Sequence, residues 1–292
     1  MVVKTSRKIY TINNDKVFDV FITVIMFAIA ILFLIPLLHV LAASFSSGDA
    51  IVSGKVGLLP VEFDLTGYVN IFKEDKFWKG LLNTLIYTVI GTVISVLCQM
   101  LCAYPLSRKD FKLKGVINFF LVITMYVSGG IIPLFILIQN LNMIDTMWAV
   151  IIPGCISVYS IIVIRTYMGN SIPYEVQEAA KIDGCSDFGI FLRVILPLSK
   201  PIIFVMILFS VVGYWNGYFN ALMFLQDSSL YPLQRVLQDM IVTTEGGLVD
   251  DPKAAEQLKY VTIFVSSLPL IIVYPFFQKY FEKGVTMGGV KG

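Results

Sequence analysis

Residues 171–201 read SIPYEVQEAAKIDGCSDFGIFLRVILPLSKP and form the longest amphipathic, charge-bearing segment of the chain. The segment lies between two strongly apolar runs that read as membrane spans, and a span takes about 20 apolar residues. Its charged side chains include Glu175, Glu178, Lys181, Asp183, Asp187 and Arg193. We therefore predict that this segment lies outside the bilayer, where another molecule makes use of it.

The composition of the whole chain is that of an integral membrane protein. Of its 292 residues, 57% are hydrophobic and 14% are charged, and the mean hydropathy is +0.80. Soluble domains contain about 45–50% apolar and about 25% charged residues. The formal net charge of +2 gives no indication of a nucleic acid or an acidic polymer as a partner.

Six apolar runs predict an all-α integral membrane protein with six transmembrane helices in a single domain over residues 1–292. The first run exceeds the apolar core of a signal peptide, about 7–15 residues, so we expect an uncleaved span. Gly, Pro, Asn and Ser interrupt the runs, and the cluster Ser128-Gly129-Gly130 with Pro133 can break or kink the third. The predicted spans are about 20–43, 81–105, 116–138, 148–168, 202–225 and 261–280.

The distribution of basic residues predicts the orientation. Lysine and arginine are enriched in cytoplasmic loops. With a cytoplasmic N-terminus, 15 of the 22 basic residues fall in the internal segments 1–19, 106–115, 165–201 and 279–292. We therefore predict that both termini and the segment 171–201 are cytoplasmic.

Local signals in this segment predict two short helices at a sharp angle. Pro173 suits the first turn of a helix, and Gly184 suits the left-handed backbone position that follows one. Ser186 is suited to cap a second helix, which we expect to end at about Ile195. Such a pair, tied to two spans, can transmit a cytoplasmic partner's movement to the membrane helices. The alternative is an interfacial hairpin that only packs on lipid headgroups.

The two longer external loops carry further expectations. The loop 44–80 is rich in aromatic residues, and a short interfacial helix fits there. The loop 226–260 is acidic and long enough to touch a soluble partner. The alternative for this loop is a solvated connector.

The sequence lacks the residues of several chemical classes. It has no G-x-x-x-x-G-K-[ST] phosphate loop, so ATP is not bound by that route. His39 is the only histidine, which removes most His-based catalytic and metal sites. Cys98 and Cys102 share a helix face, where core packing is favoured over a metal site, and no disulfide is expected. Acidic residues are nearly absent from the spans, which argues against proton- or sodium-coupled transport.

Uncharged polar and aromatic residues gather in the predicted fifth span, at Trp215, Asn216, Tyr218 and Asn220. Sugars are bound by this combination, because their CH faces stack on aromatic rings while their hydroxyls bond to amides. The four residues are therefore candidates for a substrate pathway. The alternative is that Asn216 and Asn220 hydrogen-bond to neighbouring helices, and we favour it because polar side chains commonly do so in membrane proteins.

The segment 171–201 resembles the EAA loop of ABC importer permeases, whose pattern is E-A-A, three residues, G, nine residues and I-x-L-P. This sequence has Glu178-Ala179-Ala180, three residues, Gly184, nine residues and Val194-Ile195-Leu196-Pro197. Val194 in place of Ile is the one departure. The resemblance implies an ATPase-coupling site made of Glu178, Ala179, Ala180, Asp183 and Gly184.

The resemblance extends over nearly the whole chain and indicates the carbohydrate-uptake subfamily, on the side of its smaller, maltose-type permease. It rests on the stretches Ala43-Ser44-Phe45, Asn83-Thr84, 103–108, Trp215-Asn216, 279–284 and 290–292. The stretches 128–133 and 231–234 resemble more specifically the LplC/YtcP-type permeases, which are associated with complex or plant-derived oligosaccharides.

This resemblance implies a subunit that is not an enzyme and carries no cofactor or metal. A second homologous permease would pair with it, and two cytoplasmic ATPase subunits would bind the ATP and Mg²⁺. An extracellular solute-binding lipoprotein would deliver the sugar, and the complex would lie in the cell membrane of a bacterium, among its lipids. ATP binding and hydrolysis would switch the spans between inward- and outward-facing states.

Three alternatives stay open. A permease of the same class could carry a non-sugar solute, such as a peptide or a polyamine. A secondary transporter or channel would work alone. An intramembrane enzyme is disfavoured, since the usual sets of catalytic residues are missing.

Overall fold

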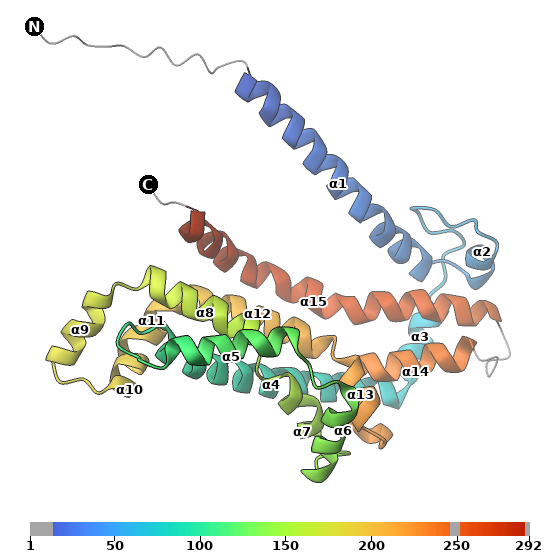
Figure 1. The fold of residues 1–292 in the computed structure, drawn as a ribbon. Helices are drawn as coiled ribbons and strands as arrows, with labels where there is room; N and C mark the ends of the chain where they lie inside the picture. Colours follow the sequence, from blue (N-terminus) through green and yellow to red (C-terminus); the bar gives the residue numbers. More distant parts are fainter. Residues whose placement is uncertain (1–13, 246–251, 290–292) are drawn as a thin grey trace, which may run out of the picture. The chain divides into compact units, whose positions relative to one another are not determined.

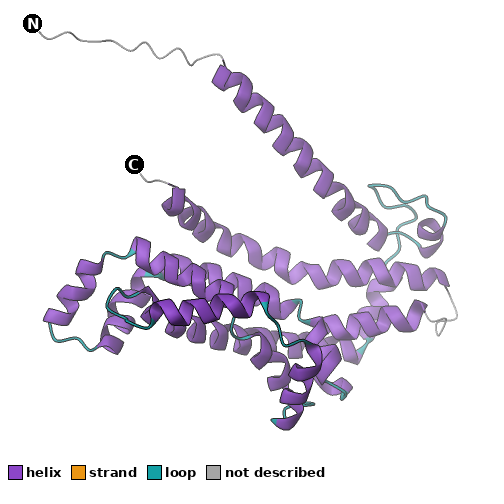
Figure 2. Ribbon diagram, viewed as in Figure 1, coloured by secondary structure: helices purple, strands orange, loops and turns teal. Residues whose placement is uncertain are grey.

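The computed structural model describes residues 14–245 and 252–289, and helices dominate these ranges (Figure 1). Within them, the one β pairing is an isolated antiparallel bridge between Ser46 and Phe63, and the ribbon shows helices and loops (Figure 2). The elements are α1 Asn14–Ser44, α2 Gly48–Val52, α3 Thr66–Lys73, α4 Asp75–Ser107, α5 Lys114–Tyr126, α6 Ile131–Asn140, α7 Met147–Ile151, the 3-10 turn η1 Ile152–Gly154, α8 Val158–Ser171, α9 Tyr174–Ile182, α10 Asp187–Ile190, the π-helical turn η2 Phe191–Ile195, α11 Leu196–Leu198, α12 Lys200–Trp215, α13 Tyr218–Phe224, the 3-10 turn η3 Ser228–Leu230, α14 Leu233–Glu245 and α15 Pro252–Gly289.

Up to six membrane spans can be formed by the described residues. The helices Lys16–Ser44, Asp75–Ser107 and Lys253–Gln278 are each long and apolar enough to cross a bilayer. Three bent pairs qualify if each counts as one span, namely α5 with α6 at 112°, 147–154 with α8 at 48°, and 187–198 with α12 at 81°. The predicted all-α, six-span fold class is confirmed, while the place of each span in a bilayer stays a prediction.

The helix breaks follow residues that form helices poorly. The third predicted span is interrupted between Tyr126 and Ile131, where Gly130 has φ +87°, a backbone region that glycine adopts without strain. The fifth predicted span, 202–225, divides at Asn216 and Gly217 into α12 and α13. Both residue types have low helix propensity. At this break the backbone N–H of Tyr218 donates a hydrogen bond to the carbonyl of Asn216 at 2.7 Å.

Contacts divide the described chain into two compact units. The first holds the described residues 14–69, 244–245 and 252–264, and in it the side-chain amide of Gln257 bonds to the backbone at the start of α3. Its Oε1 accepts from the backbone N–H of Gly67 at 3.2 Å, and its Nε2 donates to the carbonyl of Asp64 at 3.1 Å. The predicted short helix in loop 44–80 is present, since α2 and α3 both lie there.

The second unit holds 70–243 and 265–289, and α4 is its central helix. α4 packs most extensively on α12 and α8 (Figure 1). One face of α4 buries uncharged polar side chains at Thr84, Thr88, Thr92, Ser95 and Gln99. Gly91 lies on this helix where the ring of Tyr214 from α12 approaches, and a Cβ there would meet that ring at 2.6 Å. A small residue at this position therefore allows α4 and α12 to pack closely.

Candidate functional site

The segment 171–201 folds as the local signals predict. α9 ends before Gly184, whose φ of +83° lies in the left-handed region. Ser186 caps α10, with its Oγ accepting from the backbone N–H of Gly189 at 3.1 Å. The two short helices project together from one end of α8 and α12 (Figure 1).

The second helix extends beyond the predicted end at Ile195. After α10, the chain continues through the π-helical turn η2 and ends with α11 at Leu198. Pro197 lies in α11, directly after this π-helical turn, and the helix ends one residue later. The extension carries the loop directly to Ser199 and to the 81° bend that precedes α12.

Most of the predicted coupling residues are exposed. Glu178, Ala179, Asp183 and Gly184 face away from the protein, whereas Ala180 packs partly against the core. Next to them, Ile182 is 87% exposed at the end of α9. The tip of the loop therefore presents both charged and apolar side chains to its surroundings.

A hydrophobic cluster fixes the base of this loop to the spans. Ile172 before α9, and Ile190, Phe191 and Ile195 after it, are each at most 5% exposed. They pack with buried side chains of α4, α8 and α12, namely Val96, Met100, Ala103, Tyr104, Leu106, Ile161, Ile164, Met168, Ile202 and Met206. One close-packed core therefore joins the base of the loop to three helices.

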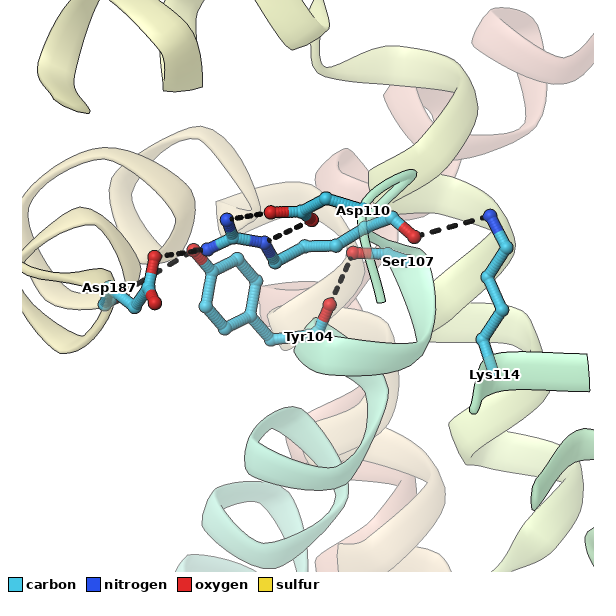
Figure 3. Close-up of polar contacts among 6 residues, drawn as sticks. Tyr104, Ser107, Asp110, Lys114 and Asp187 are labelled. Atoms are coloured by element: carbon cyan, nitrogen blue, oxygen red, sulfur yellow. Dashed lines mark hydrogen bonds and ion pairs between the residues drawn. The ribbon is translucent and has the colours of Figure 1, made fainter. Parts of the chain in front are cut away.

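Arg108 adds a polar connection between α4 and the loop (Figure 3). Its guanidinium pairs with both carboxylate oxygens of Asp110, at 2.8 Å from Nε and 2.5 Å from Nη2. Nη1 donates to Asp187 at 2.5 Å and to the Tyr104 hydroxyl at 3.2 Å. Asp187 begins α10, so one side chain binds the end of α4 to the loop. The planar guanidinium suits this role because it donates in several fixed directions.

A second contact, between Lys109 and Tyr174, also joins the segment after α4 to the loop. The ammonium of Lys109 lies 5.2 Å from the ring centroid of Tyr174, which begins α9. Cation–π pairs at exposed sites contribute about 0.5–1 kcal/mol. Two consecutive basic residues after α4 therefore contact the first residues of both loop helices.

Arg108 and Asp110 each stabilise the charged form of the other. The hydrogen bond from Arg108 lowers the pKa of Asp110 below its usual value. The same bond raises the pKa of Arg108, against a smaller opposing effect of burial. Both groups are therefore charged across the physiological pH range.

The structure does not bring the four candidate substrate-pathway residues together. Trp215 is 3% exposed and donates from Nε1 to the carbonyl of Ser266 at 2.9 Å. Asn216 donates from Nδ2 to the carbonyl of Val212 in its own helix at 3.0 Å. Tyr218 lies 6.0 Å from the guanidinium carbon of Arg235. Asn220 lines a cavity of about 330 Å³, whose lining does not include the other three.

Sequence reasoning gave no site role to three residues that the structure makes prominent, Arg108, Asp187 and Gln99. The Arg108–Asp187 pair joins residues 79 positions apart, and no sequence spacing indicates it. Gln99 lines the same cavity as Asn220. A signal for Gln99 exists in the recurrence of polar residues every three or four positions along α4, which places them on one helix face. Within the described ranges, no cluster of three or more His, Cys, Asp or Glu side chains is placed to hold a metal ion.

Comparison with known proteins gives the family. Residues 91–287 match the family described as "Binding-protein-dependent transport system inner membrane component". The chain is 39% identical over 286 residues to the polygalacturonan/rhamnogalacturonan transport system permease protein YtcP of Bacillus subtilis, covering 96% of this chain and 100% of that protein. It is 34% identical over 294 residues to protein LplC of the same organism, covering 98% and 99% of the two chains.

A solved structure agrees with these relatives. The fold matches a chain in the crystal structure of a bacterial ABC transporter involved in the import of the acidic polysaccharide alginate. The TM-score is 0.82 at 33% identity, and the match covers 93% of this chain and 99% of the other. The chain belongs to the family of inner-membrane components of binding-protein-dependent transport systems.

Proposed function

We propose that this chain is the permease subunit of an ABC importer that moves a sugar, specifically an oligosaccharide, into the cell. The observation that carries the proposal is the agreement among its relatives. Similar chains are named as permeases for polygalacturonan or rhamnogalacturonan, for arabinooligosaccharides and for diacetylchitobiose, and the matching structure belongs to an alginate importer. All of these are saccharides.

The proposed assembly contains several further subunits. A second, homologous permease completes the membrane pathway, and two cytoplasmic ATPase subunits hold the ATP and Mg²⁺. A solute-binding lipoprotein outside the cell delivers the sugar. This chain catalyses no reaction and binds no cofactor, and both of its termini are cytoplasmic. The family description supports the binding protein, because it names the transport system as dependent on one.

The loop 171–201 is the proposed coupling element. Its exposed tip, at Glu178, Ala179, Ile182 and Asp183, would dock on an ATPase. The buried cluster and the Arg108 network support this role, because they join the loop base to α4, α8 and α12. Closure of the ATPases would move the loop, and the helices joined to it would favour the outward-facing state.

The proposal is tested by uptake into proteoliposomes that contain the complete importer and its binding protein. Labelled digalacturonate, arabinotriose and diacetylchitobiose are the three probes, chosen from the sugars of similar transporters. We expect ATP-dependent uptake of at least one probe, and its loss with Glu178→Lys or Gly184→Pro. Gly184→Pro is incompatible with φ +83°.

The control is Glu74→Lys, a charge reversal of an exposed glutamate that caps α4 without a side-chain hydrogen bond. We expect uptake with this variant to equal that of the wild type. Uptake by the isolated chain without ATPase subunits would contradict the proposal, as would failure of the complete importer to move any of the three probes.

A further inference from the structure

A cavity of about 330 Å³ lies within the second unit, where α4, α8, α12 and α13 meet. Its size falls at the lower end of the range for small-ligand sites, about 300–1,000 Å³. The polar side chains that line it are all uncharged, at Gln99, Ser157, Tyr159, Ser160, Ser210, Tyr214 and Asn220. We call it the Gln99 cavity.

Two helix breaks meet at this cavity. One lies between η1 and α8, where Gly154 and Ser157 line it, and the other lies between α12 and α13, where Gly217 does. Within a membrane, non-helical backbone is tolerated where it is buried in protein or lines a cavity. Transport proteins use such discontinuous helices to build substrate sites. The meeting of two breaks at one cavity therefore favours a site over a packing defect.

Gln99 forms part of the wall of this cavity and holds a buried, unpaired acceptor behind it. Its side chain is 3% exposed, and its Nε2 donates to the carbonyl of Cys155 at 3.2 Å. Its Oε1 has no hydrogen-bond partner among the described residues. A buried amide oxygen left unpaired is costly. Because Oε1 is buried from solvent, Gln99 shapes the cavity wall, and the contacts to a ligand fall to more open side chains such as Asn220.

One aromatic wall of the cavity, the ring of Tyr214, is held in a fixed position. The Tyr214 hydroxyl lies 2.9 Å from the Ser95 Oγ and donates to the carbonyl of Ile151 at 3.0 Å. Its ring is also confined by Gly91. Tyr159 also belongs to the lining and is 56% exposed. Rigid aromatic rings beside amides and hydroxyls suit a ligand with both apolar faces and hydroxyl groups.

We infer that the Gln99 cavity binds one ring of the transported saccharide through its hydroxyls, with the side-chain amide of Asn220 hydrogen-bonding one of them. This inference rests on the proposed function and moves the substrate contact from Trp215, Asn216 and Tyr218 to the helix breaks. No cation lines the cavity, so an acidic sugar would place its carboxylate elsewhere.

Two variants test the site in the complete importer, in the same proteoliposomes and with the same three probes. Gly213 lines the cavity, and a Cβ added there meets no atom within 4 Å, so Gly213→Leu fills space without a backbone clash. We expect the initial rate of sugar uptake to fall about tenfold while the complex still assembles and hydrolyses ATP. Asn220→Leu keeps the size of the side chain, and we expect the KM for uptake to rise about fivefold through loss of a hydrogen bond.

Gly115→Leu is the matched control, since Gly115 is also helical, also has no atom within 4 Å of an added Cβ, and lies outside the cavity. We expect wild-type uptake from it. Unchanged rates and KM in both Gly213→Leu and Asn220→Leu would overturn the site while leaving the proposed function intact. If Gly213→Leu fails to assemble, the KM of Asn220→Leu alone tests the site: a rise supports it, and an unchanged KM overturns it. Absence of uptake by the wild-type importer would instead overturn the proposed function.

Discussion

Arg108 shows how one side chain can join two segments that are distant in sequence. The side chain is 12% exposed and binds two carboxylates and a phenol, from α4, the short loop after it and α10. Its carboxylate partners are more exposed, at 41% for Asp110 and 68% for Asp187. Solvent screens such pairs, so their value lies more in fixing geometry than in adding stability.

Arg108→Lys tests that geometric role. Lysine keeps the charge but cannot form the paired bonds to Asp110 while also binding Asp187. We expect a loss of about 1 kcal/mol in stability, and a lower ratio of sugar moved to ATP hydrolysed. Thermal unfolding of the purified importer and parallel uptake and ATPase assays measure these effects. Arg193→Lys, at an exposed arginine of the same loop, is the control and should change neither quantity. An unchanged transport ratio in Arg108→Lys would remove Arg108 from the coupling path.

The Arg108–Asp110 pair also predicts a pH dependence. Because Arg108 lowers the pKa of Asp110, the pair stabilises the fold above the unfolded value of the carboxyl, about 3.9. That stabilisation is lost as the pH falls through the lower, folded pKa. The difference in Tm between wild type and Asp110→Asn should therefore stay constant from about pH 8 to pH 5 and shrink toward pH 3. A difference that already disappears near pH 6 would contradict this assignment.

At the scale of elements, α4 determines how the second unit packs. Its buried polar face contacts several other elements: Thr84 Oγ1 accepts from the backbone N–H of Leu233 at 2.7 Å, and Gln99 bonds to Cys155. Between these contacts, Gly91 leaves room for the ring of Tyr214. Polar bonds and a small residue take the place of the hydrophobic effect, which does not drive helix association inside a bilayer.

Gly91→Ala tests this packing. The added Cβ would lie 2.6–2.8 Å from the Tyr214 ring, so α12 or the ring has to move. Overpacking of this kind costs about 1–3 kcal/mol, and we expect a lower Tm for the importer and weaker uptake, because Tyr214 also lines the Gln99 cavity. Gly115→Ala, where an added Cβ meets nothing within 4 Å, should leave the Tm unchanged. Equal Tm values for Gly91→Ala and wild type would contradict this, because they would show that the Tyr214 ring moves aside without loss of stability.

Much of this element structure could be predicted from sequence, because local residues decide it. The helix pair of the loop, its turn at Gly184 and its cap at Ser186 follow from rules that act over three or four residues. The division of the fifth span was not predicted, since Asn216 and Gly217 are tolerated inside many membrane helices. The substrate candidates were drawn from one helix, whereas the structure lines its cavity from α4, α8, α12 and α13. Such a site depends on tertiary contacts that carry no sequence spacing.

At the scale of the whole molecule, the proposed importer separates three tasks. ATP is hydrolysed on other subunits, the loop 171–201 receives their movement, and the helix breaks around the Gln99 cavity hold the sugar. The base of the loop and the cavity both contact α4, through Arg108 and Gln99 respectively. A rigid helix that touches both is a physical means of coupling them.

The most direct test of this account is photo-crosslinking from the tip of the loop in membranes that contain the complete importer. A benzoylphenylalanine placed at Ile182, which is 87% exposed, reports which subunit the loop touches. The same probe at Trp78, 52% exposed near the other end of α4, is the control. We predict that position 182 crosslinks to an ATPase subunit and that position 78 does not. A crosslink from position 182 to the solute-binding protein, or none to the ATPase, would contradict the account.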